Sequence, residues 1–205
     1  METLPSTPDA SPQPDSAHRI LEAALTLFAE KGFEATSIRE ICEAAGIARP
    51  SLYYFYESKE GLYRAAIEQV MRRCDERAKE ARGRATTFRE GMQFIARSVF
   101  ADVVAQPRTW KLIFQIAWSK PHAISQSIFE AFHAQWSHEM EADQAEAVAR
   151  GELAPGDTAV RSLIFMGTLG ECFGNYLTMG RPELTPELAD SLVEAILEGW
   201  TPRKS

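Results

Sequence analysis

A short stretch near the N-terminus carries side chains suited to binding DNA. It spans residues 36–63 and reads TSIREICEAAGIARPSLYYFYESKEGLY. Arg49 can donate two parallel hydrogen bonds to a guanine edge, which discriminates against other bases by about 1–3 kcal/mol. The hydroxyls of Tyr53 and Tyr54 can bond phosphate oxygens, and Lys59 adds a positive charge beside them. These residue types predict a protein that reads base edges and binds the flanking phosphates.

Two short helices around Gly46 must position these side chains. Ser37 and Glu40 have the spacing of a capping box, which predicts that a helix starts there and ends at Gly46. Pro50 lies in the first turn of a second helix, where its missing N–H costs nothing. Two helices of this size form a helix-turn-helix, whose second helix presents its first residues to the major groove. The residues in that position are Ala48, Arg49, Pro50 and Ser51.

The same stretch resembles the tetracycline-repressor (TetR) family of transcriptional regulators. The resemblance covers about residues 16–76 and rests on three segments at fixed spacing. They are Thr36-Ser37-Ile38-Arg39, Ala44-Ala45-Gly46-Ile47, and Leu52-Tyr53-Tyr54 followed by Ser58-Lys59-Glu60.

By position, the resemblance implies that some of these residues contact bases and that others contact the DNA backbone. Arg39 and residues 48–51 would read bases. The chain departs from the family at Phe55-Tyr56, where His-Phe or Tyr-Phe is usual, so one usual phosphate contact is missing at Phe55. The residues that would contact the DNA backbone are Thr36, Ser37, Tyr53, Tyr54 and Lys59.

Charge restricts how such binding can work. The 205-residue chain has a net charge of -7, whereas many nucleic-acid binders are basic. Residues 17–66 hold six Lys and Arg against seven Asp and Glu. DNA binding must therefore come from a local patch, with the acidic side chains on the face turned away from DNA.

The rest of the chain also reads as helices, so we expect an all-α fold. A Pro-, Ser-, Thr- and Asp-rich segment, residues 1–15, is too polar to bury a core and is expected to be a disordered tail. A DNA-binding domain follows over residues 16–76. Arg82-Gly83-Arg84 breaks the helical pattern and marks the boundary to a ligand-binding and dimerisation domain over residues 84–201.

The second domain concentrates aromatic side chains at helical spacing. Trp110, Phe114 and Trp118 share one helical face, and Phe129, Phe132 and Trp136 share another. Such side chains often line small-molecule sites, although they also form ordinary cores. Because the resemblance implies an effector cavity here, we expect a hydrophobic or aromatic effector. Its candidate ligands are Trp110, Phe114, Trp118, Phe129, Phe132, Trp136, Phe165, Met166, Glu171, Phe173 and Tyr176.

Glu171 stands out because it lies within an apolar helix. A buried carboxylate needs a partner, so Glu171 either orients a polar or cationic ligand or lies at a solvated edge. The same helix carries small residues on one side, which allow another helix to pack closely against it. The resemblance implies a homodimer formed by residues 160–179 and 186–198. Its two recognition helices would lie ~34 Å or a multiple of it apart, on a pseudo-palindromic operator.

Other classes of function lack support in the sequence. The three cysteines show no CxxC pair, which favours a reducing cytoplasm, and no signal peptide or membrane span is visible. His122, His133 and His138 have no metal-binding spacing, and no cofactor motif or catalytic motif appears, so we expect neither a cofactor nor an enzyme.

Three hypotheses about the function remain. The first is a repressor that an effector releases from DNA, and the second is an activator or effector-independent regulator. The third is a helical adaptor that binds only protein. The sequence names neither the effector nor the target genes.

Overall fold

The structure is a computed structural model that describes residues 14–118 and 123–201. These residues form helices and no strands, which confirms the predicted all-α class. The first helix begins at Pro14, so Pro14 and Asp15 are helical although we expected them in the tail. The rest of that predicted tail lies outside the described residues. No helix in the described ranges is long and apolar enough to cross a membrane.

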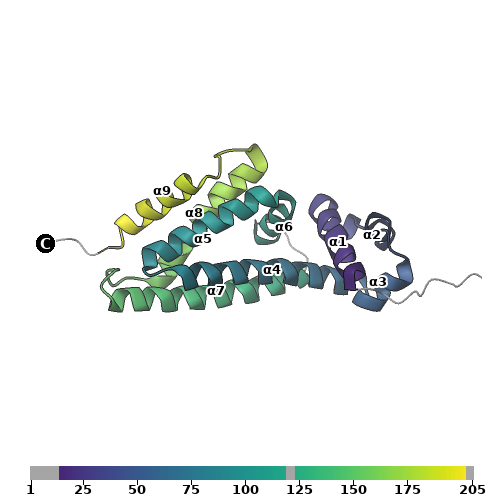
Figure 1. The fold of residues 1–205 in the computed structure, drawn as a ribbon, viewed down its shortest axis with the longest axis horizontal. Coiled ribbons are helices and arrows are strands. Elements are labelled where there is room, and N and C mark those ends of the chain that lie inside the picture. The colour runs from purple at the N-terminus through teal and green to yellow at the C-terminus, as the bar shows by residue number, and fades with distance from the viewer. Residues whose placement is uncertain (1–13, 119–122, 202–205) are drawn as a thin grey trace, which may run out of the picture. The chain divides into compact units, whose positions relative to one another are not determined.

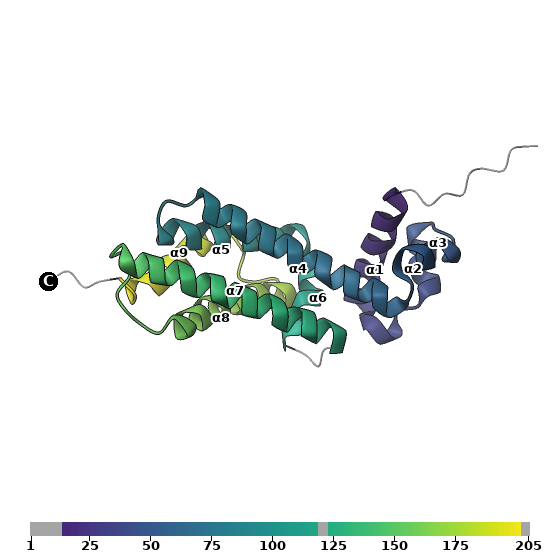
Figure 2. The same cartoon turned by 90° about the horizontal axis from the view of Figure 1, so that it is seen from below.

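The chain divides into two compact units, Met1–Ala66 and Ile67–Ser205. In the first, three helices and the first turns of a fourth surround a small core (Figures 1 and 2). The helices are α1 (Pro14–Ala35), α2 (Ile38–Ala45), α3 (Arg49–Tyr56) and α4 (Lys59–Arg84). Their core includes the fully buried side chains of Ile20, Phe28, Ile41, Leu52 and Leu62.

The turn between α2 and α3 depends on a glycine. Gly46 has φ 63° and ψ 39°, a left-handed conformation that side chains disfavour. Arg19 on α1 donates hydrogen bonds to the carbonyls of Ala45 and Gly46, which end α2. A cation at this end of a helix is favourable because the last carbonyls carry partial negative charge. The long side chain of Arg19 therefore ties α1 to the turn.

A Gly46→Ala variant is expected to lower the free energy of unfolding by about 1–2 kcal/mol, the usual cost of a left-handed non-glycine residue. Its Cβ would also lie 2.8 Å from Nη2 of Arg19. Urea unfolding followed by circular dichroism measures the loss. Gly83→Ala is the matched control, because Gly83 is in α4 with no atom within 4 Å of a new Cβ. Equal losses at both positions would contradict this account of the turn.

The second unit is a bundle built from most of α4 and five further helices. They are α5 (Phe88–Ala105), α6 (Pro107–Trp118), α7 (Ala123–Ala149), α8 (Thr158–Met179) and α9 (Pro186–Glu198). Helix α5 lies beside α9, and α7 lies beside α8 (Figures 1 and 2). Arg97 of α5 binds Asp190 of α9 through two hydrogen bonds, one of 2.6 Å from its Nε.

Helix α4 differs from the sequence expectation at its end. Arg82-Gly83-Arg84, which the sequence marks as a break, lies in the last turn of an unbroken helix from Lys59 to Arg84. A glycine weakens a helix by only about 1 kcal/mol, and packing of α4 offsets that cost. Arg82 contributes by pairing with Glu139 at 2.6 Å and Asp143 at 2.9 Å on α7.

Candidate nucleic-acid interface and effector region

The start of α2 is fixed by the capping box that the sequence predicts. The Ser37 side chain accepts from the Glu40 N–H at 3.2 Å, and the Glu40 carboxylate accepts from the Ser37 N–H at 2.9 Å. Lys31 also donates to Glu40 at 2.6 Å. The hydrogen bonds from Lys31 and Ser37 lower the pKa of Glu40 to about 2. The cap thus stays ionised and intact at neutral pH.

The first turn of α3 is exposed, as a base-reading segment must be. Ala48, Arg49 and Pro50 are exposed and Ser51 is half-buried, while Leu52 is fully buried against the unit's core. Ala48 precedes the helix with an extended backbone and makes no side-chain cap. The burial of Leu52 holds the segment against the unit and leaves the preceding side chains free to meet a groove.

Three of the expected phosphate contacts, Tyr53, Tyr54 and Lys59, follow this turn in the sequence. Tyr54 is 70% exposed and Tyr53 is 38% exposed. The ammonium of Lys59 lies 4.3 Å from the centre of the Phe33 ring, and it approaches the Glu34 carbonyl at 3.4 Å. Lys59 is therefore held near the surface by weak contacts that a phosphate can replace.

Thr36 is buried, although we expected it to contact the DNA backbone. Its side chain is 1% exposed, and its hydroxyl donates to the carbonyl of Gly32 at 2.8 Å. The Thr36 N–H also donates, to the carbonyl of Phe33 at 3.3 Å. Its side chain therefore connects the end of α1 to the start of α2, and a phosphate contact is available to neighbouring Ser37 instead, which is exposed.

Two residues that hold the site together, Tyr56 and Arg19, are not identified by local sequence patterns. Tyr56 donates its hydroxyl to the Ala17 carbonyl at 2.9 Å, and burial raises the pKa of Tyr56. Arg19 caps α2, as described above. Both join segments that are distant in sequence, so no local spacing identifies them. Together they hold α1 against α3, the proposed base-reading helix, and against the turn between α2 and α3.

The predicted effector residues of the second unit are split between core and surface. Trp110, Trp136, Phe165 and Phe173 are each at most 7% exposed. The half-buried members are Phe114, Phe129, Phe132, Met166 and Tyr176, whereas the Trp118 side chain lies outside the described residues. Glu171 is exposed and accepts from Asn175 at 2.7 Å, so it lies at a solvated edge and not within the core.

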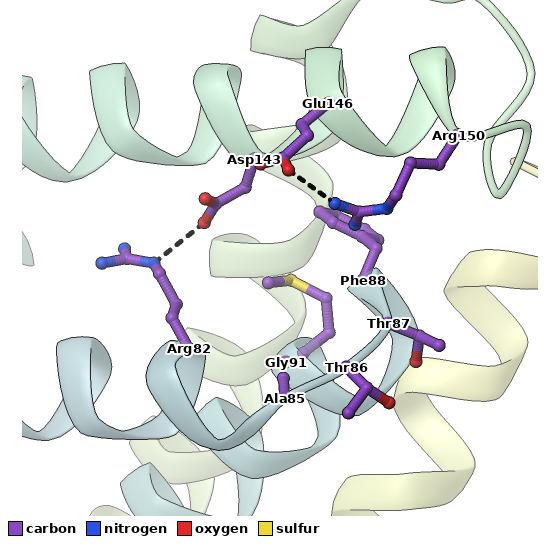
Figure 3. A pocket seen from close by; sticks show the side chains of 10 residues that line it. Arg82, Ala85, Thr86, Thr87, Phe88, Gly91, Asp143, Glu146 and Arg150 are labelled. Carbon is purple, nitrogen blue, oxygen red and sulfur yellow. Dashed lines mark ion pairs between the residues drawn. The ribbon is translucent and has the colours of Figure 1, made fainter.

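Two cavities in the described part of the second unit bear on this prediction. A space of about 30 Å³, the volume of one water molecule, adjoins Trp110. A larger cleft of about 220 Å³ lies between α7 and the α4–α5 junction, and none of the eleven predicted effector residues lines it. Figure 3 shows its two ion pairs, Arg82 with Asp143 and Arg150 with Glu146. Within the described part of this cluster, the Phe114 ring packs on Phe173, with ring centres 6.3 Å apart.

A buried carboxylate joins three helices next to Trp110. Asp102 of α5 is 9% exposed and accepts from the Trp110 indole N–H at 2.8 Å and from Gln106 at 3.0 Å. It also forms an ion pair with Arg77 of α4. Trp110 in turn packs on Phe173, with ring centres 5.3 Å apart. Asp102 thus connects α4 to the aromatic cluster.

An Asp102→Ala variant is expected to lower the free energy of unfolding by about 2–3 kcal/mol. Removing one partner of a fully buried ion pair costs about 3–5 kcal/mol, but Arg77 is 39% exposed and water can hydrate its charge. Thermal or urea unfolding measures the loss. Asp75→Ala removes only the surface pair with Lys79 and is expected to cost about 0.5 kcal/mol or less. Equal effects would show that Asp102 contributes no more than a surface charge.

Comparison with known proteins supports a DNA-binding role for the first unit. Residues 20–66 match the family model described as bacterial regulatory proteins, tetR family. Over 50 residues the chain is 42% identical to the biofilm operon icaADBC HTH-type negative transcriptional regulator IcaR of Staphylococcus epidermidis. That match covers 24% of this chain and 27% of the relative, so the two share less than a third of the relative's length.

Solved structures resemble the whole described fold. The fatty acid degradation regulator FadR from Bacillus halodurans superposes with a TM-score of 0.79 at 19% identity, covering 92% of this chain and 97% of that one. The regulator FadR from Bacillus subtilis, solved in complex with stearoyl-CoA, superposes with a TM-score of 0.78 at 20% identity, covering 89% and 98%. At these identities the similarity establishes a shared fold.

Proposed function

Because the chain belongs to the tetR family of bacterial regulatory proteins, we propose that it regulates transcription by binding operator DNA. The observation that carries this proposal is the exposed first turn of α3, with Arg49 at its surface and Leu52 buried behind it. Arg49 and its neighbours, Ala48, Pro50 and Ser51, read base edges in this proposal. Ser37, Tyr53, Tyr54 and Lys59 bind phosphates on either side.

Arg39 is the second candidate base reader. It is 84% exposed and forms an ion pair of 3.2 Å with Glu43, one turn further along α2. Both side chains are solvated, so the pair is weak and DNA can replace Glu43 as the partner of Arg39. The chain's net charge is -7, so such local cations, and not the overall charge, attract the phosphates.

The protein acts as a homodimer in this proposal, and α8 supplies the interface. Val160, Leu163, Ile164 and Gly167 lie at spacings of three and four residues, and all four are exposed. Leu163 is 72% exposed, which is unfavourable for a large apolar side chain in water unless a partner covers it. A second copy of the chain, packing α8 and α9 against the same helices, is the partner that fits a two-fold operator.

The regulator is released from DNA by a small effector bound in the second domain, residues 84–201. The residues proposed to contact it are the eleven candidates from the sequence, and among those whose side chains the structure describes five are half-buried. A hydrophobic or aromatic molecule fits this lining. An activator, or a regulator without an effector, has the same reading helix and is the second candidate. Either would act in the cytoplasm, where the operator is, through its DNA-binding domain over residues 16–76.

The proposal is tested by titrating the full-length protein into DNA from upstream of its own gene. Gel shift or fluorescence anisotropy is expected to show specific binding that survives an excess of unrelated DNA. Specific affinities are typically about 10³–10⁷ times tighter than non-specific ones. Equal affinity for operator and unrelated DNA, or no binding at all, would favour a protein-binding adaptor and overturn the proposal.

A further inference from the structure

Arg49 is held in place by a neighbour on its own helix. Its Nη2 donates to the hydroxyl oxygen of Tyr53 at 3.2 Å. Its guanidinium carbon lies 5.5 Å from the centre of the Tyr53 ring, within the range of a cation–π contact. Arg49 and Tyr53 are four residues apart, so one turn of α3 sets both contacts. The position of the guanidinium is therefore restricted before any DNA arrives.

The partner of Arg49 is neutral, unlike that of Arg39. Glu43 pairs with Arg39 and competes with phosphates and bases for its charge. Tyr53 leaves the positive charge of Arg49 uncompensated and uses only one of the five guanidinium N–H groups. The remaining N–H groups can form the two parallel bonds that a guanine edge accepts.

We propose that Tyr53 is a positioning residue that sets the base specificity of Arg49, beyond the phosphate contact expected from the sequence. This inference rests on the proposed function. Arginine has many rotamers, and ordering them on binding reduces affinity. A guanidinium already held by the hydroxyl and ring of Tyr53 loses less freedom on meeting guanine. The preference for guanine at that base pair therefore depends on Tyr53, although Tyr53 touches no base.

The exposure of the two tyrosines agrees with different roles. Tyr53 is 38% exposed, with its hydroxyl bonded to Arg49, whereas Tyr54 is 70% exposed and its ring meets Phe55 at 5.1 Å. Tyr54 therefore has the freer hydroxyl and suits a phosphate. Tyr54→Phe is the matched control, because it removes the same atom from the adjacent residue.

The test is a double-mutant cycle on the full-length protein. Tyr53→Phe, Arg49→Ala and the double variant are titrated into the operator and into operators with each base pair changed in turn. Tyr53→Phe is expected to weaken operator binding about 5–150-fold, because the dimer loses one neutral hydrogen bond to Arg49 in each of its two copies. The loss is expected to be several-fold smaller on the operator changed at the base pair that Arg49 reads and in the Arg49→Ala background, where Tyr53→Phe removes only a phosphate contact.

Three results separate the alternatives. If Tyr53→Phe weakens binding equally on every DNA and in both backgrounds, as expected for Tyr54→Phe, Tyr53 is only a phosphate contact and the inference is wrong. If Tyr53→Phe has no effect on operator binding, the inference is also wrong. If the wild-type protein prefers no DNA sequence, the proposed function fails and the inference fails with it. Unchanged melting of Tyr53→Phe establishes that the variant folds.

Discussion

Replacing Arg49 by alanine is expected to remove most of the protein's preference for its operator. A bidentate arginine–guanine pair contributes about 1–3 kcal/mol of discrimination. A dimer on a palindromic site uses the residue twice, so the loss is about 2–6 kcal/mol, or roughly 30-fold to 10⁴-fold in affinity. Non-operator DNA should be bound nearly as before, because phosphate contacts dominate that binding. Parallel anisotropy titrations on operator and scrambled DNA measure both quantities.

Arg72→Ala is the matched control for this prediction. Arg72 is likewise solvent-exposed, at 65%, and is paired weakly with Glu76 along α4, but it lies outside the helix-turn-helix. We expect it to change both affinities by less than about twofold. A similar loss for Arg49→Ala on operator and scrambled DNA would mean that Arg49 binds phosphate and reads no base.

A charge at the centre of the exposed face of α8 is expected to produce monomers. In Leu163→Glu, a side chain that is 72% exposed in one copy would be buried, charged and unpaired between two copies. Because two linked half-sites bind about 10²–10⁴-fold tighter than one, operator affinity should fall by that factor. Analytical ultracentrifugation measures the mass, and anisotropy measures the affinity.

Val104→Glu controls for the introduced charge. Val104 is also an exposed apolar residue, at 47%, but it lies on α5. This variant is expected to remain dimeric and to bind the operator normally. A dimeric Leu163→Glu protein, or dissociation in both variants, would show that the interface lies elsewhere.

Local sequence patterns predicted most of the fold and the position of α3. The Ser37–Glu40 spacing located the start of α2, and Gly46 located its end, because capping depends on near neighbours in sequence. Pro50 located the first turn of α3, and so placed Arg49 at the exposed start of that helix. These features depend only on helix geometry and near neighbours in the chain, so they can be predicted from the sequence.

Features that depend on distant contacts could not be predicted in this way. Thr36 is a polar residue that is buried because the carbonyls of Gly32 and Leu27 receive its hydroxyl. Glu171 lies in an apolar helix, and the sequence left open whether it orients a ligand or lies at a solvated edge; it is exposed because α8 keeps one apolar face uncovered within a single copy. Asp102 gains its partners from α4 and α6. Each of these places is determined by packing between helices.

Selection of bound fragments from sheared genomic DNA tests the central claim most directly. The full-length protein is incubated with the fragments at physiological salt, and the retained DNA is sequenced. We expect enrichment of an inverted repeat whose half-sites lie one helical turn, or a multiple of it, apart, and loss of that enrichment with Arg49→Ala. Retention of fragments without any shared sequence, or the same motif with Arg49→Ala, would contradict it.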